Sequence, residues 1–435
     1  MNLARGLTAL GTCLLISTVW AQTTPNEAMD LLGAYSLARK SDPVFLAAQA
    51  TYNANKQILV QAGGSLLPTI NGSADSTRYE TSGGSGNFDM TGYTLSVKQP
   101  VFNAALFSAL GQARAVVRQA EAEFGSAQQD LMLRTAERYL GALAARDNVE
   151  LAEAEYSAIS RQLEVANGRL AAGLGTITEV HDARARAQLA EAVRLEANNL
   201  LEDSLDALRE VTGDFANNLK QLKETVPSVT PEPEDAATWV KTALDKNLEI
   251  QARLASFDTA QKQVAVERSG HLPTVDVFGK RTKTESTPAL TTDGTSNSVG
   301  VELTVPIFQG GIVSSRTTQA KFNRDAAWQN LEASRRNIRR QTRTAYSGII
   351  SGIQRVDALK QAVVASESAL EAKTTGFEAG INTNLDVLDA QRDLFLTKRD
   401  YAQARYTYIL DLLRLKKAAG QLSENDLKQV NGWLQ

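Results

Sequence analysis

The stretch EAGINTNLDVLDAQ, residues 378–391, breaks a helical pattern at a glycine and restarts it at a threonine, after which two aspartates lie three residues apart. An earlier stretch, AAGLGTITEVHDAR at 171–184, follows the same plan. Four positions match at identical intervals: Gly173, Thr176, Glu179 and Asp182 in the earlier stretch, and Gly380, Thr383, Asp386 and Asp389 in the later one. The chain therefore contains an internal repeat, and each copy has a glycine-marked hinge between two helices.

The duplication spans most of the chain. LLPT at 66–69 matches HLPT at 271–274, and QPVF at 99–102 matches VPIF at 305–308, with a nearly constant offset of about 206 positions. A proline-rich segment, ETVPSVTPEPED, separates the two copies. We therefore expect a first repeat that ends at 226, a linker at 227–235 and a second repeat at 236–435.

The first 21 residues are typical of a secretory signal peptide. They have one positive charge at Arg5, then an apolar run, and they end in Val-Trp-Ala before Gln22. Cleavage after Ala21 removes Cys13, the only cysteine, and with it any disulfide or thiol chemistry. The alternative is a lipoprotein signal lipidated at Cys13, but Thr12 suits that role poorly and the apolar run continues beyond it. The signal peptide is therefore expected at 1–21, and the first repeat at 22–226.

Composition argues against several functions. The 435 residues carry a net charge of −3 and a pI near 5.7, so no basic excess indicates a nucleic-acid partner. The two histidines, His181 and His271, have no second histidine or cysteine nearby that could complete a metal site. No P-loop, nucleophile-elbow or zinc signature is present. The sequence therefore predicts no enzyme, no cofactor and no bound metal.

Two long stretches contain no proline. All ten prolines fall outside 101–226 and 307–435, and both stretches are rich in residues that favour helix. The part of the first stretch before its hinge, roughly 65 residues, would be about 95 Å long as a helix, which is too long for a compact domain. Each stretch is therefore expected to be a helical hairpin, with tip hinges near 168–178 and 376–385. After Gly420 the chain is expected to add a short, mostly polar tail.

Before each P-[VI]-F motif the sequence alternates with a period of two. In YTLSVKQP and VGVELTVP the apolar residues point one way and most of the polar residues the other way. The partner strands begin at the LPT motifs, and loops rich in Gly, Ser, Thr, Asn and Asp join each pair. Strands are predicted at about 67–81, 91–102, 272–286 and 298–308.

The predicted strands have the length and pattern of strands that cross a membrane. No run of about 18 apolar residues follows the signal, so no transmembrane helix is expected. Strands of roughly ten residues can cover the hydrocarbon layer when tilted, although two ordinary hairpins on a soluble core fit the strands alone equally well. In a membrane, four strands cannot close a barrel, and an open sheet edge would leave backbone groups unpaired. Several copies must then share one barrel: two copies give eight strands and three give twelve.

The whole arrangement resembles the TolC family of outer-membrane efflux proteins. The most specific stretches are LPT…QPVF, LPTV…VPIF and AGINTNLDVLDAQRDLFLTKRDYAQARYTYILDLLRLKKAAGQL. The resemblance implies an α+β membrane protein and a homotrimer, in which a twelve-strand β-barrel in the outer membrane continues into a twelve-helix α-barrel across the periplasm. Loops 81–91 and 287–298 would then lie outside the cell.

The resemblance also implies a function. The trimer would be the exit duct of a tripartite export system, passing small-molecule toxins or secreted proteins from an inner-membrane transporter to the exterior. A periplasmic adaptor would complete the system, and docking would open a tip that is closed at rest.

The paired aspartates of the second repeat have two interpretations. Thr383 with Asp386 fits a capping box, and the helix dipole favours an acid in the first turn. A cap does not explain Asp389, which is one turn deeper and on the same face as Asp386. The resemblance implies that both aspartates face the pore at its narrowest point, where the six carboxylates of a trimer would attract cations.

The other hinge residues are expected to shape the gate. Thr176 and Glu179 match the cap of the second repeat and Asp182 matches Asp389; the resemblance implies packing and tip contacts for the first-repeat acids, because the family's constriction uses the second repeat. Phe377 and Asn382 stand where some relatives place Tyr and Arg in bonds that hold the gate shut.

Two further classes of protein would have different sequences. An exported coiled-coil adhesin or structural surface protein should show heptads without tip hinges, and should lack two membrane-length hairpins at matching places in a duplication. A general porin should have many strands and short turns in place of four strands and long helices. The sequence favours the export duct over both.

Overall fold

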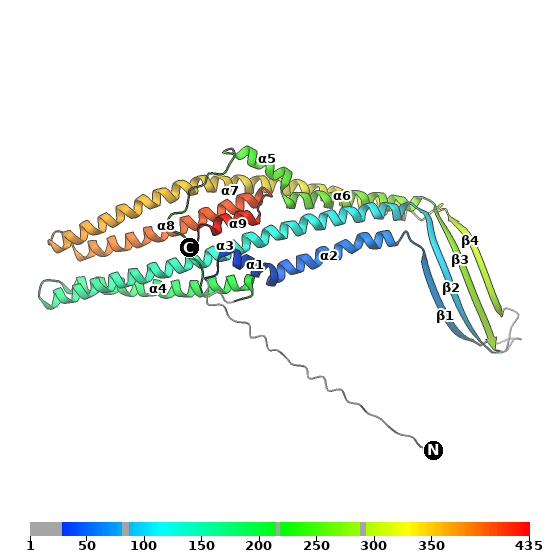
Figure 1. The fold of residues 1–435 in the computed structure, drawn as a ribbon, viewed down its shortest axis with the longest axis horizontal. Coiled ribbons are helices and arrows are strands. Elements are labelled where there is room, and N and C mark those ends of the chain that lie inside the picture. The colour runs from blue at the N-terminus through cyan, green and yellow to red at the C-terminus, as the bar shows by residue number, and fades with distance from the viewer. Residues whose placement is uncertain (1–27, 81–86, 215–217, 288–292) are drawn as a thin grey trace, which may run out of the picture.

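The structure is a computed structural model that describes residues 28–80, 87–214, 218–287 and 293–435. The predicted signal peptide at 1–21, including Cys13, lies outside the described residues, as do parts of both predicted outer loops. The described chain is elongated, with a sheet at one end and two helical turns at the other (Figure 1). It has an α+β fold that is dominated by helices.

The helices and strands follow the duplication. In chain order they are α1 (Leu31–Ser41), α2 (Pro43–Gly64), β1 (Thr69–Tyr79), β2 (Phe88–Asn103), α3 (Ala104–Ala171), α4 (Ile177–Thr212), α5 (Ala236–Lys246), α6 (Leu248–Arg268), a 3₁₀ turn η1 (Ser269–His271), β3 (Thr274–Thr287), β4 (Gly294–Thr304), α7 (Ile312–Glu378), α8 (Asn384–Ala418) and α9 (Glu424–Asn431). The long helices α3 and α7 run from the sheet to the tip (Figure 1).

The four strands form one antiparallel sheet in the order β1-β2-β3-β4, so β1 and β4 each have an open edge in the described protomer. Because neighbouring positions alternate between the two faces, the part of the sheet nearer the helices has a mostly apolar face and a mostly polar face, whereas Arg281 and Lys283 lie on the apolar side toward the far end. One face carries Ile70, Leu95, Val97, Val277, Val299, Val301 and Leu303, all of which are exposed. The other carries Asn71, Ser73, Thr94, Ser96, Lys98, Ser298 and Glu302.

Strand β4 begins and ends earlier than the predicted range of 298–308. Its first residues, GTSNS, have no apolar alternation, yet they pair with β3 from Gly294 opposite Thr284 to Ser298 opposite Lys280. Backbone pairing therefore extends the strand beyond the side-chain pattern. Its other end is Thr304, because Pro306 has no N–H to continue the ladder.

The largest core cluster lies midway along the molecule, where α1, α5 and α9 pack against the long helices (Figure 1). The segment after Gly420 is short and mostly polar, as predicted, but it is more than a tail, because residues 424–431 form α9. Its Leu427 and Val430 are fully buried, and Trp433 beyond it is nearly so. A spacing of three residues places Leu427 and Val430 on the same helical face.

Helix ends meet at this level in both repeats. Asn247 caps α6 by accepting hydrogen bonds from Glu249 N and Ile250 N, and its Nδ2 donates to Ala418 O, the last residue of α8, at 2.9 Å. In the first repeat, Asp42 caps α2, and the neighbouring Ser41 Oγ donates to the last carbonyl of α4 at 2.5 Å. Asn247, at the start of α6, is therefore bonded to the end of α8, and Ser41, just before the start of α2, is bonded to the end of α4.

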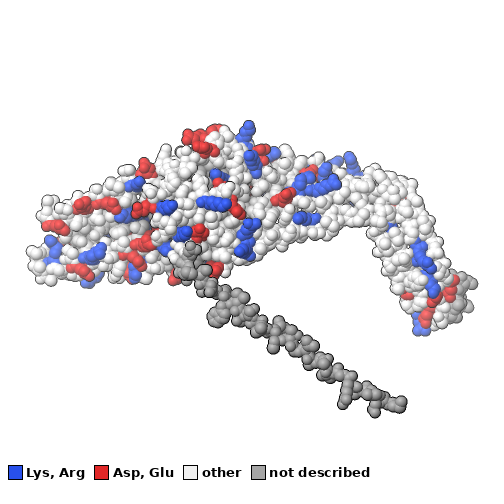
Figure 2. All heavy atoms as spheres, viewed as in Figure 1, with Lys and Arg blue, Asp and Glu red and all other residues white. Residues whose placement is uncertain are grey.

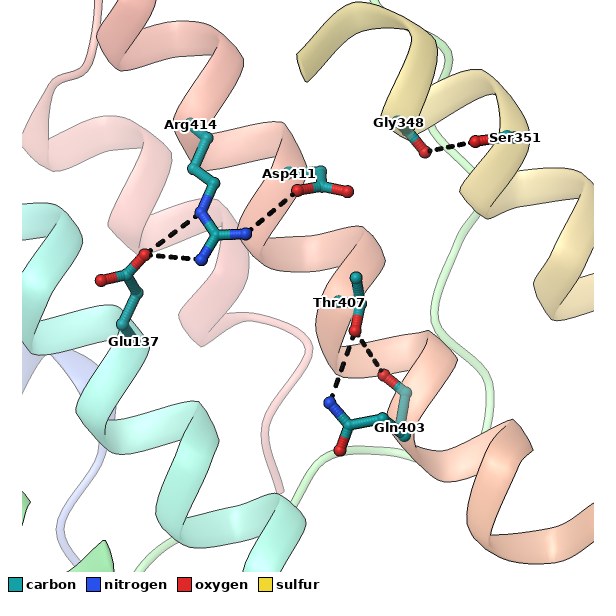
Figure 3. Close-up of polar contacts among 7 residues, drawn as sticks. All are labelled: Glu137, Gly348, Ser351, Gln403, Thr407, Asp411 and Arg414. Carbon is teal, nitrogen blue, oxygen red and sulfur yellow. Dashed lines mark hydrogen bonds and ion pairs between the residues drawn. The ribbon is translucent and has the colours of Figure 1, made fainter. Parts of the chain in front are cut away.

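A row of polar contacts, which we call the α3–α8 seam, joins the two helical hairpins. Figure 3 shows one of them, in which Arg414 of α8 donates to Glu137 of α3 at 2.8 Å and to Asp411 at 3.2 Å. In every contact of the seam the acid is on α3 and the donor is on α8. The seam comprises Asp130 with Lys417, Glu137 with Arg414, Asp147 with Tyr406, and Glu155 with Arg399.

Charged side chains are distributed unevenly along the molecule. Figure 2 shows them spread over the helices, whereas on the visible face of the sheet they gather toward the end far from the helices. The pairs Arg78–Asp89 and Lys283–Glu285 lie at that end. Within the described ranges, no helix is both long enough and apolar enough to cross a membrane.

Candidate functional site at the helical tip

The two tip turns have the same backbone geometry. Gly173 and Gly380 follow α3 and α7 with φ values of +74° and +76°, which lie in the left-handed region that favours glycine. Leu174 N donates to Arg169 O at 2.8 Å, and Ile381 N donates to Gly376 O at 2.7 Å. These bonds satisfy carbonyl groups at the ends of the helices in the pattern of a Schellman motif. The repeated glycines therefore place two matching hairpin turns at one end of the molecule.

The capping box of the second repeat is complete. Thr383 Oγ1 accepts from Asp386 N at 3.2 Å, and Asp386 Oδ2 accepts from Thr383 N at 2.8 Å and from Thr383 Oγ1 at 2.6 Å. These hydrogen bonds lower the pKa of the Asp386 carboxyl, and the positive charge of Lys373 on α7 lowers it further. Asp386 is therefore held as a carboxylate in the first turn of α8.

The first repeat has only half of this arrangement. Thr176 Oγ1 accepts from Glu179 N at 3.3 Å and caps α4. The Glu179 side chain instead lies over the turn, where its Oε2 is 3.1 Å from the position that a Cβ on Gly175 would occupy. Asp182, one turn further along α4, is exposed. The two repeats therefore share their turns and differ in how their acids are used.

Asp389 has a different environment from Asp386. Its Oδ1 is 2.6 Å from Arg186 Nη2 on α4 and 3.9 Å from Arg392 Nη1 on α8. The side chains of Arg186 and Asp389 are 25% and 36% exposed, so the pair is partly shielded from water. Asp386 and Asp389 are both at the tip, but only Asp389 forms an ion pair within the described protomer.

Phe377 and Asn382 make contacts near the second turn. The guanidinium of Arg169, at the end of α3, lies 4.9 Å from the centre of the Phe377 ring, so a cation–π contact joins α3 to α7. Asn382 Nδ2 donates to Lys373 O at 3.3 Å and lies directly over Gly376. Phe377 therefore links the two hairpins, whereas Asn382 folds back onto the last turn of its own helix.

Sequence reasoning missed the partners on the first hairpin. Gln162 of α3 donates a hydrogen bond to the Oδ1 of Asn384, a buried residue at the start of α8. Arg169 and Arg186 supply the contacts to Phe377 and Asp389. Because these three partners lie some 200 residues from the groups they contact, spacing along one helix gives no signal for them. Arg186 is four residues after Asp182, a spacing that suggests a pair within α4.

Comparisons with known proteins agree with this geometry. The model of the family described as outer membrane efflux protein matches residues 34–214 and 239–421. The chain is 34% identical to outer membrane protein TolC of Vibrio cholerae over 98% of this chain and 96% of that protein. It is 29% identical to the alkaline protease secretion protein AprF of Pseudomonas aeruginosa, over 93% and 87% of the two chains.

The fold is shared with solved structures. The outer membrane protein VceC from Vibrio cholerae superposes with a TM-score of 0.78 at 22% identity, over 90% of this chain and 96% of that one. The family match covers most of both helical hairpins and both pairs of strands. The chain therefore belongs to the outer membrane efflux protein family.

Proposed function

We propose that three copies of the chain form the exit duct of a tripartite export system, with a twelve-strand barrel in the outer membrane and a twelve-helix barrel across the periplasm. As a family member, the chain is an outer-membrane channel for efflux or secretion. In the proposed trimer each copy contributes two repeats, at 22–226 and 236–435, joined by the linker at 227–235.

The observation that carries this proposal is the four-stranded sheet with two open edges. Edges β1 and β4 are each 11 residues long, and they run antiparallel to each other because the sheet has an even number of antiparallel strands. The β4 edge of one copy can therefore pair antiparallel with the β1 edge of the next. Three copies would close twelve strands and leave no backbone edge exposed to lipid.

The two faces of the sheet support the same arrangement. The exposed valines and leucines of the apolar face would contact lipid, and the polar face would line the channel. On the polar face Lys98 Nζ is 3.0 Å from Asp276 Oδ2 and 3.8 Å from Glu302 Oε2, as expected for a surface in contact with water. The same closure would arrange α3, α4, α7 and α8 of three copies around the axis.

At the other end, the tip would form the gate. In a trimer the turns at Gly173 and Gly380 would meet around the axis, and Asp386 and Asp389 would face the constriction. The partly shielded contact of Phe377 with Arg169 would help to hold the gate closed. We expect a closed resting state that conducts cations in preference to anions.

The proposed partners are a periplasmic adaptor and an inner-membrane transporter. The long helices would carry the tip toward the inner membrane, where a transporter would supply energy. AprF is named for protease secretion, and another relative, CzcC, for cobalt, zinc and cadmium resistance, so ducts of this family serve more than one cargo. We propose small-molecule toxins or secreted proteins as the cargo. The adhesin alternative is not favoured, because the chain belongs to a family of channel proteins.

The test is a reversal-potential measurement on the detergent-purified mature protein in a planar bilayer with a KCl gradient. A small, stable current with cation preference, from a protein that native mass spectrometry shows to be trimeric, would support the proposal. Changing both Asp386 and Asp389 to Asn should abolish the cation preference. An unchanged reversal potential in that variant would remove both residues from the pore.

A further inference from the structure

The two tip aspartates lie on the same side of α8, but their partners differ. Asp386 is hydrogen-bonded to Thr383, which is uncharged, and Lys373 acts on it only through its charge, without an ion-pair contact. Asp389 is bonded to Arg186, whose Nη2 is 2.6 Å from its Oδ1. Hydrogen bonds from Thr383 leave the full negative charge of Asp386 in place, whereas Arg186 cancels that of Asp389.

We propose that Arg186 sets the ion selectivity of the duct by neutralising Asp389, so that Asp386 alone supplies the free negative charge at the constriction. The inference rests on the proposed function, because it needs both aspartates to face the pore. In a trimer it leaves three uncompensated carboxylates at this level where the sequence pattern alone suggests six.

The charges around Asp389 support this assignment. Arg392, 3.9 Å from Asp389, is more closely bonded to Asp393, at 2.9 Å, so those two residues form a second neutral pair. Asp389, Arg186, Arg392 and Asp393 together have no net charge. On α4, Glu179 and Asp182 lie two turns and one turn before Arg186, and neither forms an ion pair within the described residues. Arg186 therefore serves Asp389 and not its own helix.

Partial burial makes the neutralisation effective. A fully exposed pair is weakened by water and salt, but only a quarter of the Arg186 side chain is exposed. The contact also joins α4 of the first hairpin to α8 of the second. In this contact the first hairpin supplies the arginine and the second supplies the acid. The α3–α8 seam has the reverse arrangement, with the acid on the first hairpin. Arg186 thus brings positive charge from the first hairpin to Asp389 at the proposed constriction.

The experiment is a charge series measured by reversal potential in a KCl gradient. Arg186→Gln should double the free carboxylates from three to six and shift the reversal potential further toward that of potassium. Arg186→Lys keeps the charge and should behave as the wild type. The double variant R186Q/D389N removes both members of the pair and should return the reversal potential to the wild-type value.

Arg184→Gln is the matched control. Arg184 is exposed and two residues away, so it lies on a different face of α4, and its loss should leave selectivity unchanged. Native mass spectrometry and circular dichroism confirm that each variant is a folded trimer before its current is measured.

The outcomes separate this inference from the proposed function. If the wild type prefers cations and D386N/D389N does not, but R186Q shifts no more than R184Q, the inference is wrong and the proposed pore stands. If D386N/D389N keeps the wild-type reversal potential, neither aspartate faces the pore, and the inference falls together with that part of the proposed function. A shift of the reversal potential in R186Q that is reversed in the double variant R186Q/D389N would establish Arg186 as a selectivity residue.

Discussion

At the scale of single residues, the tip shows how one side-chain type acquires two roles. Asp386 is the third residue of α8 and completes a capping box, so its charge is stabilised by hydrogen bonds and by the helix terminus. Asp389 is one turn further, beyond the cap, and its charge is matched by Arg186. Local sequence determines the first environment, and a contact between hairpins determines the second.

The environment of Asp386 predicts a pH dependence. Its pKa is lowered by Thr383, so the carboxylate should remain charged, and the channel cation-selective, until the pH falls below the usual range of a carboxyl group. Thr383→Val removes the hydroxyl bond and should raise the pKa of Asp386, so selectivity should be lost at a higher pH. Reversal potentials recorded as the pH is lowered give the midpoint.

The lowered pKa of Asp386 also makes the free energy of unfolding depend on pH, and it falls as the pH falls. A carboxyl with a lowered pKa in the folded protein stabilises the fold above its unfolded pKa, and this contribution is lost as the pH falls through the folded value. Thr383→Ser keeps the hydroxyl and is the control, with a midpoint like that of the wild type. Identical midpoints for T383V and wild type would show that the cap does not control this charge.

At the scale of helices and strands, matching turns have unequal surroundings. Gly380 at the tip and Gly420 at the middle of the molecule both have left-handed φ values, +76° and +68°. A Cβ on Gly380 would meet open space, whereas a Cβ on Gly420 would overlap the carbonyl of Lys246 and the backbone of Asn247. Gly380 meets only the requirement for a left-handed backbone, whereas Gly420 also permits close packing between helix ends.

This difference predicts unequal effects of alanine. Gly380→Ala should cost about 1–2 kcal/mol through the left-handed conformation alone. Gly420→Ala adds a backbone clash at the α8–α6 junction and should cost distinctly more, because the Asn247 bond to Ala418 must also shift. Thermal unfolding in detergent, followed by circular dichroism, compares the two variants. Equal melting temperatures would contradict the close approach at Gly420.

The α3–α8 seam supports a second prediction at this scale. Glu155 is buried, burial raises its pKa, and Arg399 partly offsets the effect at 2.6 Å. Glu155→Gln and Arg399→Gln should each lower the melting temperature, because each leaves a partly buried charge unpaired. The double variant should lose less than the two single changes combined, with a coupling energy of about 0.5–3 kcal/mol. Strict additivity in this cycle would show that the pair does not fasten the hairpins.

What could be predicted from the sequence depends on the range of the interaction. Proline-free stretches and hinge glycines predicted the helical hairpins, and Thr383 with Asp386 predicted a cap that is present. Arg186 could not be predicted, because a partner on another helix is fixed by packing and leaves no local period. The early start of β4 at Gly294 could not be predicted either, because it depends on backbone pairing with β3, which needs no apolar side chains. Helix α9 was missed because its apolar residues are few and bury against distant helices.

At the scale of the whole molecule, the protomer has surfaces that a single copy leaves uncovered. Its sheet has two open edges, and its apolar face exposes large side chains, with Val299 and Val301 at 87% and 69% exposed. Alternate residues from Val299 to Leu303 on β4 are apolar, and the exposed Val305 and Ile307 continue this pattern beyond the end of the strand. An outward-facing apolar band is what a barrel in the outer membrane needs on its lipid-facing side.

A pair of lysine substitutions on β4 tests which face meets lipid. Val301 lies within the apolar band, and Ser298, on the same strand, lies on the opposite face. Val301→Lys should cost about 2–4 kcal/mol if it is placed near the middle of the membrane, and should reduce the amount of folded trimer in the outer membrane. Ser298→Lys would add the same charge to the channel lining and should assemble normally, while lowering the cation preference of the current. Membrane fractionation and native mass spectrometry measure assembly, and the reversal potential measures the charge in the channel. Equal assembly of the two variants would mean that the apolar face does not contact lipid, and the closure of three sheets into one barrel would then lack its physical basis.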